Sequence, residues 1–213
     1  MVNNGYRPVT AVWEVTMGCN MRCGHCGSSC AGPLPGELST EEALDLCDQI
    51  AELGLKWITL SGGEPLTRKD TPDLIKRLTA NGVSVNIITN GWLLTEEMAR
   101  KIKENGIATA AISIDGTPEI HDKIRKEGAF EHARRAFAAM KEQGIDTGAV
   151  TTITKQNIGI LRWRTRSGGK PSFQESTGIT TRRCTGIVDV ALTSEKNAGI
   201  RKNFRSNKVH RQV

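Results

Sequence analysis

Three cysteines lie close together near the start of the chain. Cys19, Cys23 and Cys26 form a C-x3-C-x2-C run directly after an apolar stretch. Thiolates at this spacing can hold one metal centre, and soft sulfur ligands select zinc or an iron–sulfur cluster. A structural zinc site usually has four protein ligands, commonly in two separated pairs, and this run has no second pair. Three cysteines on a four-iron cluster would leave one iron open to a substrate or cofactor.

Two residues near this run are alternatives for a fourth metal ligand. His25 lies inside the run, and Cys30 follows it after a Gly-Ser-Ser spacer. A free loop thiol is the expectation for Cys30, whereas Cys47 is expected to be a buried core thiol on the apolar stripe of a helix. The N-terminus shows no secretory signal, so the six cysteines favour metal or redox chemistry over disulfides, and the cytoplasm is the expected location.

The elements that must position these residues alternate between strand and helix patterns. Strands are predicted at 9–16, 56–61, 83–89, 108–115 and 148–154, and helices at 39–54, 70–82, 95–106 and 129–143. This alternation is typical of an α/β fold with parallel strands, and because the crossovers are right-handed the units should wind into a partial barrel. No apolar run approaches the ~18 residues that span a bilayer, so no membrane partner is expected.

The unusual residues fall where the predicted strands end. The cysteine run follows the first strand, 61–65 the second, 89–91 the third and 113–116 the fourth. The carboxyl ends of parallel strands lie at one edge of a sheet, and ligands of such sheets bind there. The sequence therefore predicts one site at this edge.

Two of these segments together resemble the motifs of the radical S-adenosylmethionine (radical SAM) enzymes. The cysteine run has their C-x3-C-x-Φ-C form, with His25 at the position of an aromatic residue or histidine, and Gly-Gly-Glu-Pro at 62–65 matches their GGEP motif. The resemblance runs from about Trp13 to Asn157. Segments 113–116 and 121–125 are most similar to the peptide-modifying maturases that carry a cysteine-rich, SPASM-type auxiliary-cluster domain.

The resemblance implies a partial (β/α) radical SAM barrel and a mechanism. Cys19, Cys23 and Cys26 would hold three irons of a [4Fe-4S] cluster, and the fourth iron would chelate S-adenosylmethionine. The reduced cluster would cleave this cofactor to methionine and a 5′-deoxyadenosyl radical that abstracts hydrogen from a substrate. An oxidoreductase or maturase activity, a peptide substrate and a flavodoxin- or ferredoxin-type electron donor are implied with it.

Cofactor contacts at the GGEP motif follow from the same resemblance. Gly62 and Gly63 would let the backbone approach the cofactor closely. Glu64 would accept a charge-assisted hydrogen bond from the methionine ammonium group. Pro65 would fix the turn that follows, and Asn90 would bond the ribose.

Three further cofactor contacts are predicted beyond the third strand. Ser113 and Asp115 share one face of a strand, where Ser113 would bond the ribose or methionyl portion, and Arg125 would meet the methionine carboxylate bidentately. The alternatives are capping or turn roles for Asn90, Ser113 and Asp115, and a solvated charge run for Arg125. His121 and His132 have no evident partners and are expected at the surface.

The net charge of +6 comes from the last quarter of the chain. Residues 1–160 hold 17 basic and 20 acidic side chains, whereas residues 161–213 hold 12 and 3. Residues 1–160 are thus a mildly acidic core, for which nucleic acid is not the expected partner. The 161–213 segment has neither a helical nor a strand period and is expected to be irregular.

We interpret the change at residue 160 as a change of reading frame or a truncated gene model, because family members continue there with a further helix and strand. Cys184 would then be incidental. The alternative is a disordered basic tail that binds acidic surfaces or nucleic acid. Two other functions stay open for the whole chain: a non-enzymatic zinc or iron–sulfur module, and an inactive fragment of a radical SAM enzyme.

Overall fold

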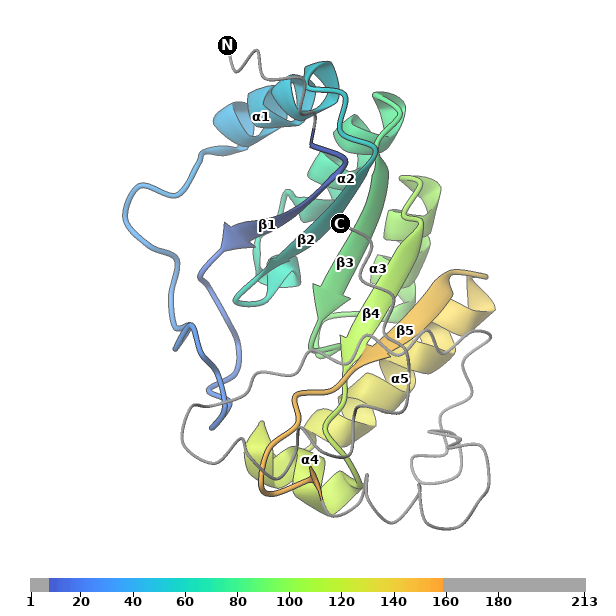
Figure 1. Cartoon of the computed structure of the whole chain (residues 1–213). Coiled ribbons are helices and arrows are strands. Elements are labelled where there is room, and N and C mark those ends of the chain that lie inside the picture. The colour runs from blue at the N-terminus through green and yellow to red at the C-terminus, as the bar shows by residue number, and fades with distance from the viewer. Residues whose placement is uncertain (1–7, 159–213) are drawn as a thin grey trace, which may run out of the picture.

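Five parallel strands form one sheet, in the order in which they occur along the chain (Figure 1). The structure is a computed structural model, and it describes residues 8–158. The strands are β1 (Thr10–Thr16), β2 (Trp57–Gly62), β3 (Ser84–Thr89), β4 (Thr109–Ser113) and β5 (Asp146–Val150). Ile58 pairs with Val85, and Ile87 with Ala110, which sets the register of the central strands. The predicted parallel α/β sheet is confirmed.

The two faces of the sheet differ because strand side chains alternate. Ile58, Leu60 and Ile87 point to the face that the helices cover, and all three are fully buried. Residues of the opposite register face the open side, where Val12 is 69% exposed and Asn86 is half-buried. The core therefore lies between the sheet and the helices, and no helix or strand of residues 8–158 covers the opposite face of the sheet.

Helices connect the strands, and most of them lie along one face of the sheet (Figure 1). They are α1 (Thr40–Glu52), α2 (Thr71–Ala80), α3 (Glu96–Glu104), α4 (Pro118–Ile124) and α5 (Ala129–Glu142), with a short 3-10 turn η1 (Pro65–Thr67). Ser39 and Glu42 form the predicted capping box of α1, and the Thr95 hydroxyl accepts from Met98 N at the start of α3. None of the described helices is long and apolar enough to cross a membrane.

The elements differ from prediction in two places. Helix α4 is not among the predicted helices, because it is too short to show a clear helical period and its sequence has only the pattern of a charged run. Strand β5 begins and ends earlier than predicted, because Thr151 and the residues after it turn toward the end of β4. The predicted boundary at 160, the 161–213 segment and Cys184 lie outside the described residues.

Candidate cofactor site

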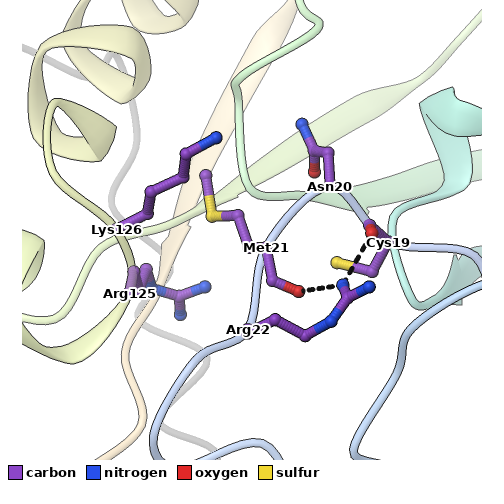
Figure 2. A pocket seen from close by; sticks show the side chains of 6 residues that line it. All are labelled: Cys19, Asn20, Met21, Arg22, Arg125 and Lys126. Carbon is purple, nitrogen blue, oxygen red and sulfur yellow. Dashed lines mark hydrogen bonds between the residues drawn. The ribbon is translucent and has the colours of Figure 1, made fainter.

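The predicted site residues gather at the carboxyl edge of the sheet. The cysteine loop follows β1, GGEP ends β2, Asn90 follows β3, and Asp115 follows β4. A pocket of about 460 Å³ opens at this edge beside the cysteine loop (Figure 2), a size typical of cofactor sites. Its lining consists of Cys19, Asn20, Met21, Arg22, Arg125 and Lys126.

The cysteine loop is held by its own main chain. Cys19 N donates to Ala31 O at 2.9 Å, and Cys26 N donates to Cys23 O at 3.0 Å. Its three predicted ligands are free thiols, with Cys19 and Cys23 half-buried and Cys26 exposed. Within residues 8–158, no three His, Cys, Asp or Glu side chains converge as ligands of a single ion. Three thiols in one loop could each bind a separate iron of a cubane cluster.

The thiols of this loop differ in acidity. Burial raises the pKa of Cys19 and of Cys23, and at Cys23 the charge of Arg125 opposes the rise. At Cys26 burial also acts to raise the pKa, but the N–H groups of Cys30, Ser28 and Ser29 outweigh it, so the pKa is lowered. Because the thiolate is the metal-binding form, this nest of N–H groups prepares Cys26 to act as a ligand.

The GGEP motif contacts the cysteine loop through its main chain. Gly63 N donates to Thr16 O at 2.7 Å, and Glu64 N donates to Gly18 O at 2.8 Å. A Cβ atom on Gly62 would overlap the Thr16 carbonyl oxygen, and one on Gly63 would overlap the Gly18 carbonyl oxygen. These glycines are therefore required by the main chain at the end of β1 and at the start of the cysteine loop, and the predicted approach of the backbone to the cofactor stays a prediction.

The Glu64 carboxylate is buried without a cation. Its side chain accepts from Leu66 N at 3.1 Å, Thr89 Oγ1 at 2.8 Å and Asn90 N at 2.7 Å, and Glu64 is 1% exposed. None of the ion pairs among the described residues includes it, and burial raises its pKa. A buried carboxylate with neutral donors alone is costly, and an ammonium ligand would compensate it.

Asn20 is a site residue that the sequence reasoning missed. Asn90 Nδ2 donates to Asn20 Oδ1 at 2.8 Å, and Asn90 Oδ1 accepts from Trp92 N at 2.9 Å. Asn20 Nδ2 is then a buried donor with no partner among residues 8–158, beside the pocket. Such a group needs a hydrogen-bond acceptor, which a bound polar cofactor could supply. The signal in the sequence is an amide side chain inside the cysteine run.

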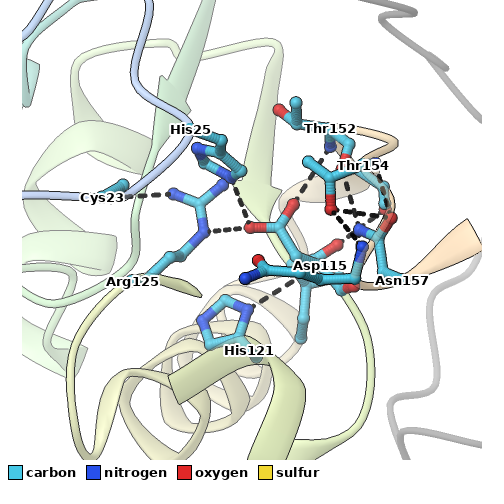
Figure 3. Close-up of polar contacts among 11 residues, drawn as sticks. Cys23, His25, Asp115, His121, Arg125, Thr152, Thr154 and Asn157 are labelled. Atoms are coloured by element: carbon cyan, nitrogen blue, oxygen red, sulfur yellow. Dashed lines mark hydrogen bonds and ion pairs between the residues drawn. The ribbon is translucent and has the colours of Figure 1, made fainter. Parts of the chain in front are cut away.

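Asp115 and Arg125 bind each other (Figure 3). Arg125 Nε donates to Asp115 Oδ2 at 2.6 Å, His25 Nε2 lies 2.9 Å from the same oxygen, and Thr152 N donates to Oδ1 at 3.0 Å. Burial acts to raise the pKa of Asp115, but the bonds and charges of His25 and Arg125 lower it to about 2. His25 thus points away from the cysteines, and Arg125 reaches Cys23 Sγ at 3.9 Å.

Other predicted residues lie at or near the same edge. Ser113, the last residue of β4, is 9% exposed, and Pro65 begins the η1 turn and is buried. The expectation of a surface His121 is wrong: it is fully buried, and its Nδ1 accepts from Asp115 N at 3.0 Å. His132 is half-buried and stacks on Trp92.

The two remaining described cysteines are both buried. Cys47 packs in the core as predicted, and burial raises its pKa to about 12. Cys30 is a free thiol as predicted, but it is only 6% exposed, and burial followed by the neighbouring Cys26 raises its pKa. Cys30 therefore belongs to the surroundings of Cys26.

Known proteins are similar to the part of the chain that forms this site. The model of the Radical SAM superfamily matches residues 13–159. Fe-coproporphyrin III synthase of Methanosarcina barkeri is 42% identical over 154 residues, which are 71% of this chain and 38% of that protein. The mycofactocin maturase MftC of Mycolicibacterium smegmatis is 34% identical over 156 residues, 72% of this chain and 40% of MftC. The chain thus spans about two fifths of the length of these relatives.

A solved structure shows the same fold. The crystal structure of Streptococcus suis SuiB superposes with a TM-score of 0.65 at 16% sequence identity. The match covers 92% of this chain and 45% of SuiB. This similarity confirms the predicted partial-barrel architecture.

Proposed function

The chain belongs to the radical SAM superfamily, and from this premise we propose that it is the core of an enzyme that cleaves S-adenosylmethionine at a [4Fe-4S] cluster. Cys19, Cys23 and Cys26 would hold the cluster. When bound, the cluster would supply the electron for reductive cleavage of S-adenosylmethionine to methionine and a 5′-deoxyadenosyl radical, the species that would take hydrogen from a substrate. The protein's own residues bind and orient the cofactor.

The buried Glu64 carboxylate carries this proposal. It lies directly beside the cysteine loop, because Glu64 N is bonded to Gly18 O. The methionine ammonium of the cofactor would supply the cation that Glu64 lacks among the described residues. The unpaired Asn20 Nδ2 would donate to an oxygen of the same ligand.

The other predicted cofactor contacts remain part of the proposal, and a different observation bears on each of them. Asn90 is oriented by Asn20 and Trp92, and Ser113 ends a neighbouring strand. Arg125 lines the pocket but also binds Asp115, so only part of its guanidinium is available for the methionine carboxylate. The Asp115 carboxylate holds Arg125 and contacts His25, so we propose that it positions these side chains beside the predicted cofactor contact.

Two substrate classes follow from the relatives. MftC is named as a maturase, which supports the peptide substrate expected from the sequence. Fe-coproporphyrin III synthase is named for a porphyrin, and its identity to this chain is higher, at 42%. A porphyrin is therefore the second candidate. A flavodoxin- or ferredoxin-type protein would donate the electron.

Anaerobic reconstitution with iron and sulfide tests the proposed function. We expect four irons per chain, an electron paramagnetic resonance signal of the reduced protein that changes on addition of S-adenosylmethionine, and formation of 5′-deoxyadenosine. Cys26→Ser should lose the cluster, whereas Cys184→Ser should retain it. Stoichiometric zinc without cofactor cleavage would instead establish the non-enzymatic module, and a cluster without cleavage would establish the inactive fragment.

A further inference from the structure

The Arg125 guanidinium lies between a carboxylate and a cysteine sulfur (Figure 3). Its Nε donates to Asp115 Oδ2 at 2.6 Å, and its Nη1 donates to Cys23 Sγ at 3.9 Å. The Arg125 side chain is 9% exposed and that of Asp115 is not exposed at all. Charges buried to this extent are only weakly screened by solvent and salt. The positive charge of Arg125 therefore acts on Cys23 at close range.

The position of Arg125 is fixed from several sides. The Asp115 carboxylate that holds it also accepts from Thr152 N and contacts His25 Nε2. The main chain of Asp115 is bonded to His121 Nδ1 through its N–H and to Asn157 Nδ2 through its carbonyl oxygen. The guanidinium is thus held in place against the cysteine loop from β4 and from the segment after β5.

The main chain beside Arg125 contacts the same loop. Gly24 N, next to Cys23, donates to Ile124 O at 2.8 Å, and Arg125 N donates to His121 O at 2.9 Å. The end of α4 and the middle of the cysteine loop therefore move together. The bond from Gly24 thus joins the residue after Cys23 to the residue before Arg125.

We propose that Arg125, held by Asp115, is a positioning residue that places a positive charge beside Cys23 and raises the reduction potential of the cluster. The net charge near a cluster and the hydrogen bonds to its sulfurs set its potential, and residues behind the ligands tune it. This inference rests on the proposed function, because it concerns the cluster that Cys23 would hold. It is separate from any contact of Arg125 with the methionine carboxylate.

A purely structural role of the Arg125–Asp115 ion pair would have a different consequence for the potential. If Arg125 and Asp115 only hold the loop together, the loss of either partner loosens the same contact and moves the potential in the same direction. If the charge of Arg125 acts on the cluster, the two losses have opposite effects. Removing the cation lowers the potential, and removing the anion raises it.

The experiment measures the midpoint potential of the reconstituted cluster without S-adenosylmethionine, so that cofactor contacts play no part. In Arg125→Gln, the ratio of reduced to oxidised cluster at a fixed poise should fall about tenfold, which for a one-electron couple corresponds to about 59 mV. In Asp115→Asn this ratio should rise. Arg125→Lys keeps the charge and should recover at least half of the shift on the millivolt scale.

Lys123→Gln is the matched control, because it removes an exposed cation from the same helix two residues away. Its potential should equal that of the unmodified protein. The inference is overturned if Arg125→Gln and Asp115→Asn shift the potential in the same direction, or if neither differs from Lys123→Gln. Should Arg125→Gln fail to load a cluster, Asp115→Asn decides alone, and a potential that does not rise overturns the inference.

The unmodified protein shows whether a failure concerns the role of Arg125 or the proposed function. If it loads a cluster and cleaves S-adenosylmethionine while the variants show no opposite shifts, only the role of Arg125 is refuted. If it takes up no cluster, the proposed function fails and this inference fails with it.

Discussion

Replacing Gly63 with alanine should displace the cysteine loop. The added Cβ would overlap the Gly18 carbonyl oxygen and lie 2.8 Å from Met17 O, and both are main-chain atoms that cannot rotate away. Relief requires the end of β2 to move from the loop, which breaks the bonds of Gly63 N to Thr16 O and of Glu64 N to Gly18 O. Each such bond contributes about 1 kcal/mol net, and overpacking adds about 1 to 3 kcal/mol.

We therefore expect Gly63→Ala to lower the free energy of unfolding by about 3 to 5 kcal/mol. The assay is urea unfolding of the iron-free protein, followed by circular dichroism. Reconstitution of the same preparation should then yield less than half of the iron bound by the unmodified protein. Iron loading reports on the cysteine loop directly, whereas urea unfolding reports on the stability of the whole fold.

Gly32→Ala is the matched control for this variant. Gly32 lies in the segment that follows the cysteine loop, has no positive φ, and has nothing within 4 Å of the position of an added Cβ. Its substitution should change the unfolding free energy by less than about 0.5 kcal/mol and leave iron loading intact. The reasoning is refuted if Gly63→Ala matches Gly32→Ala in both measurements.

Two other predictions concern buried titratable groups. Glu64→Gln should raise the Kd for S-adenosylmethionine in reconstituted protein about tenfold or more, because one charge-assisted hydrogen bond is lost. Thr89→Val removes only a neutral donor to Glu64 and should change this Kd less than about threefold. Equal affinities of Glu64→Gln and the unmodified protein would contradict the role of Glu64. Burial and the nearby Arg125 lower the pKa of His121 to about 4. The unfolded chain then binds a proton below pH ~6.5 that the folded protein does not, so the free energy of unfolding should fall by about 3 kcal/mol between pH 6.5 and 4. His121→Asn should lack this contribution when urea unfolding is compared across that range, and an unchanged pH dependence in the variant would refute it.

The sequence pattern predicted the parts of the fold that depend on local regularity. Alternation of apolar residues located the strands, and the motifs after β1 and β2 fell at one edge because parallel strands share their direction. The three predicted cluster cysteines came from their spacing together with the GGEP motif, and their role as cluster ligands stays a prediction. These features are readable because each is encoded within a few consecutive residues.

The missed features depend on contacts between distant segments. His25 pairs with Asp115 across 90 positions, and the burial of His121 depends on Phe130 and on the strand that precedes Asp115. Neither the His25–Asp115 contact nor the burial of His121 produces a periodic pattern in the local sequence. A glycine in the sequence shows only that something approaches closely, and the structure is needed to show that the Thr16 carbonyl lies against Gly62, while the predicted approach to the cofactor stays a prediction.

The cysteine loop is held by main-chain bonds on two sides, from the GGEP segment and from the end of α4. Such bonds do not require iron, so the loop can have its shape before any metal arrives. Little chain entropy then remains to be lost when the cluster is inserted. For an oxygen-sensitive centre this has a practical meaning: oxidative loss of the cluster would leave the receiving segment ordered, and repair would require iron and sulfide but no refolding of the protein.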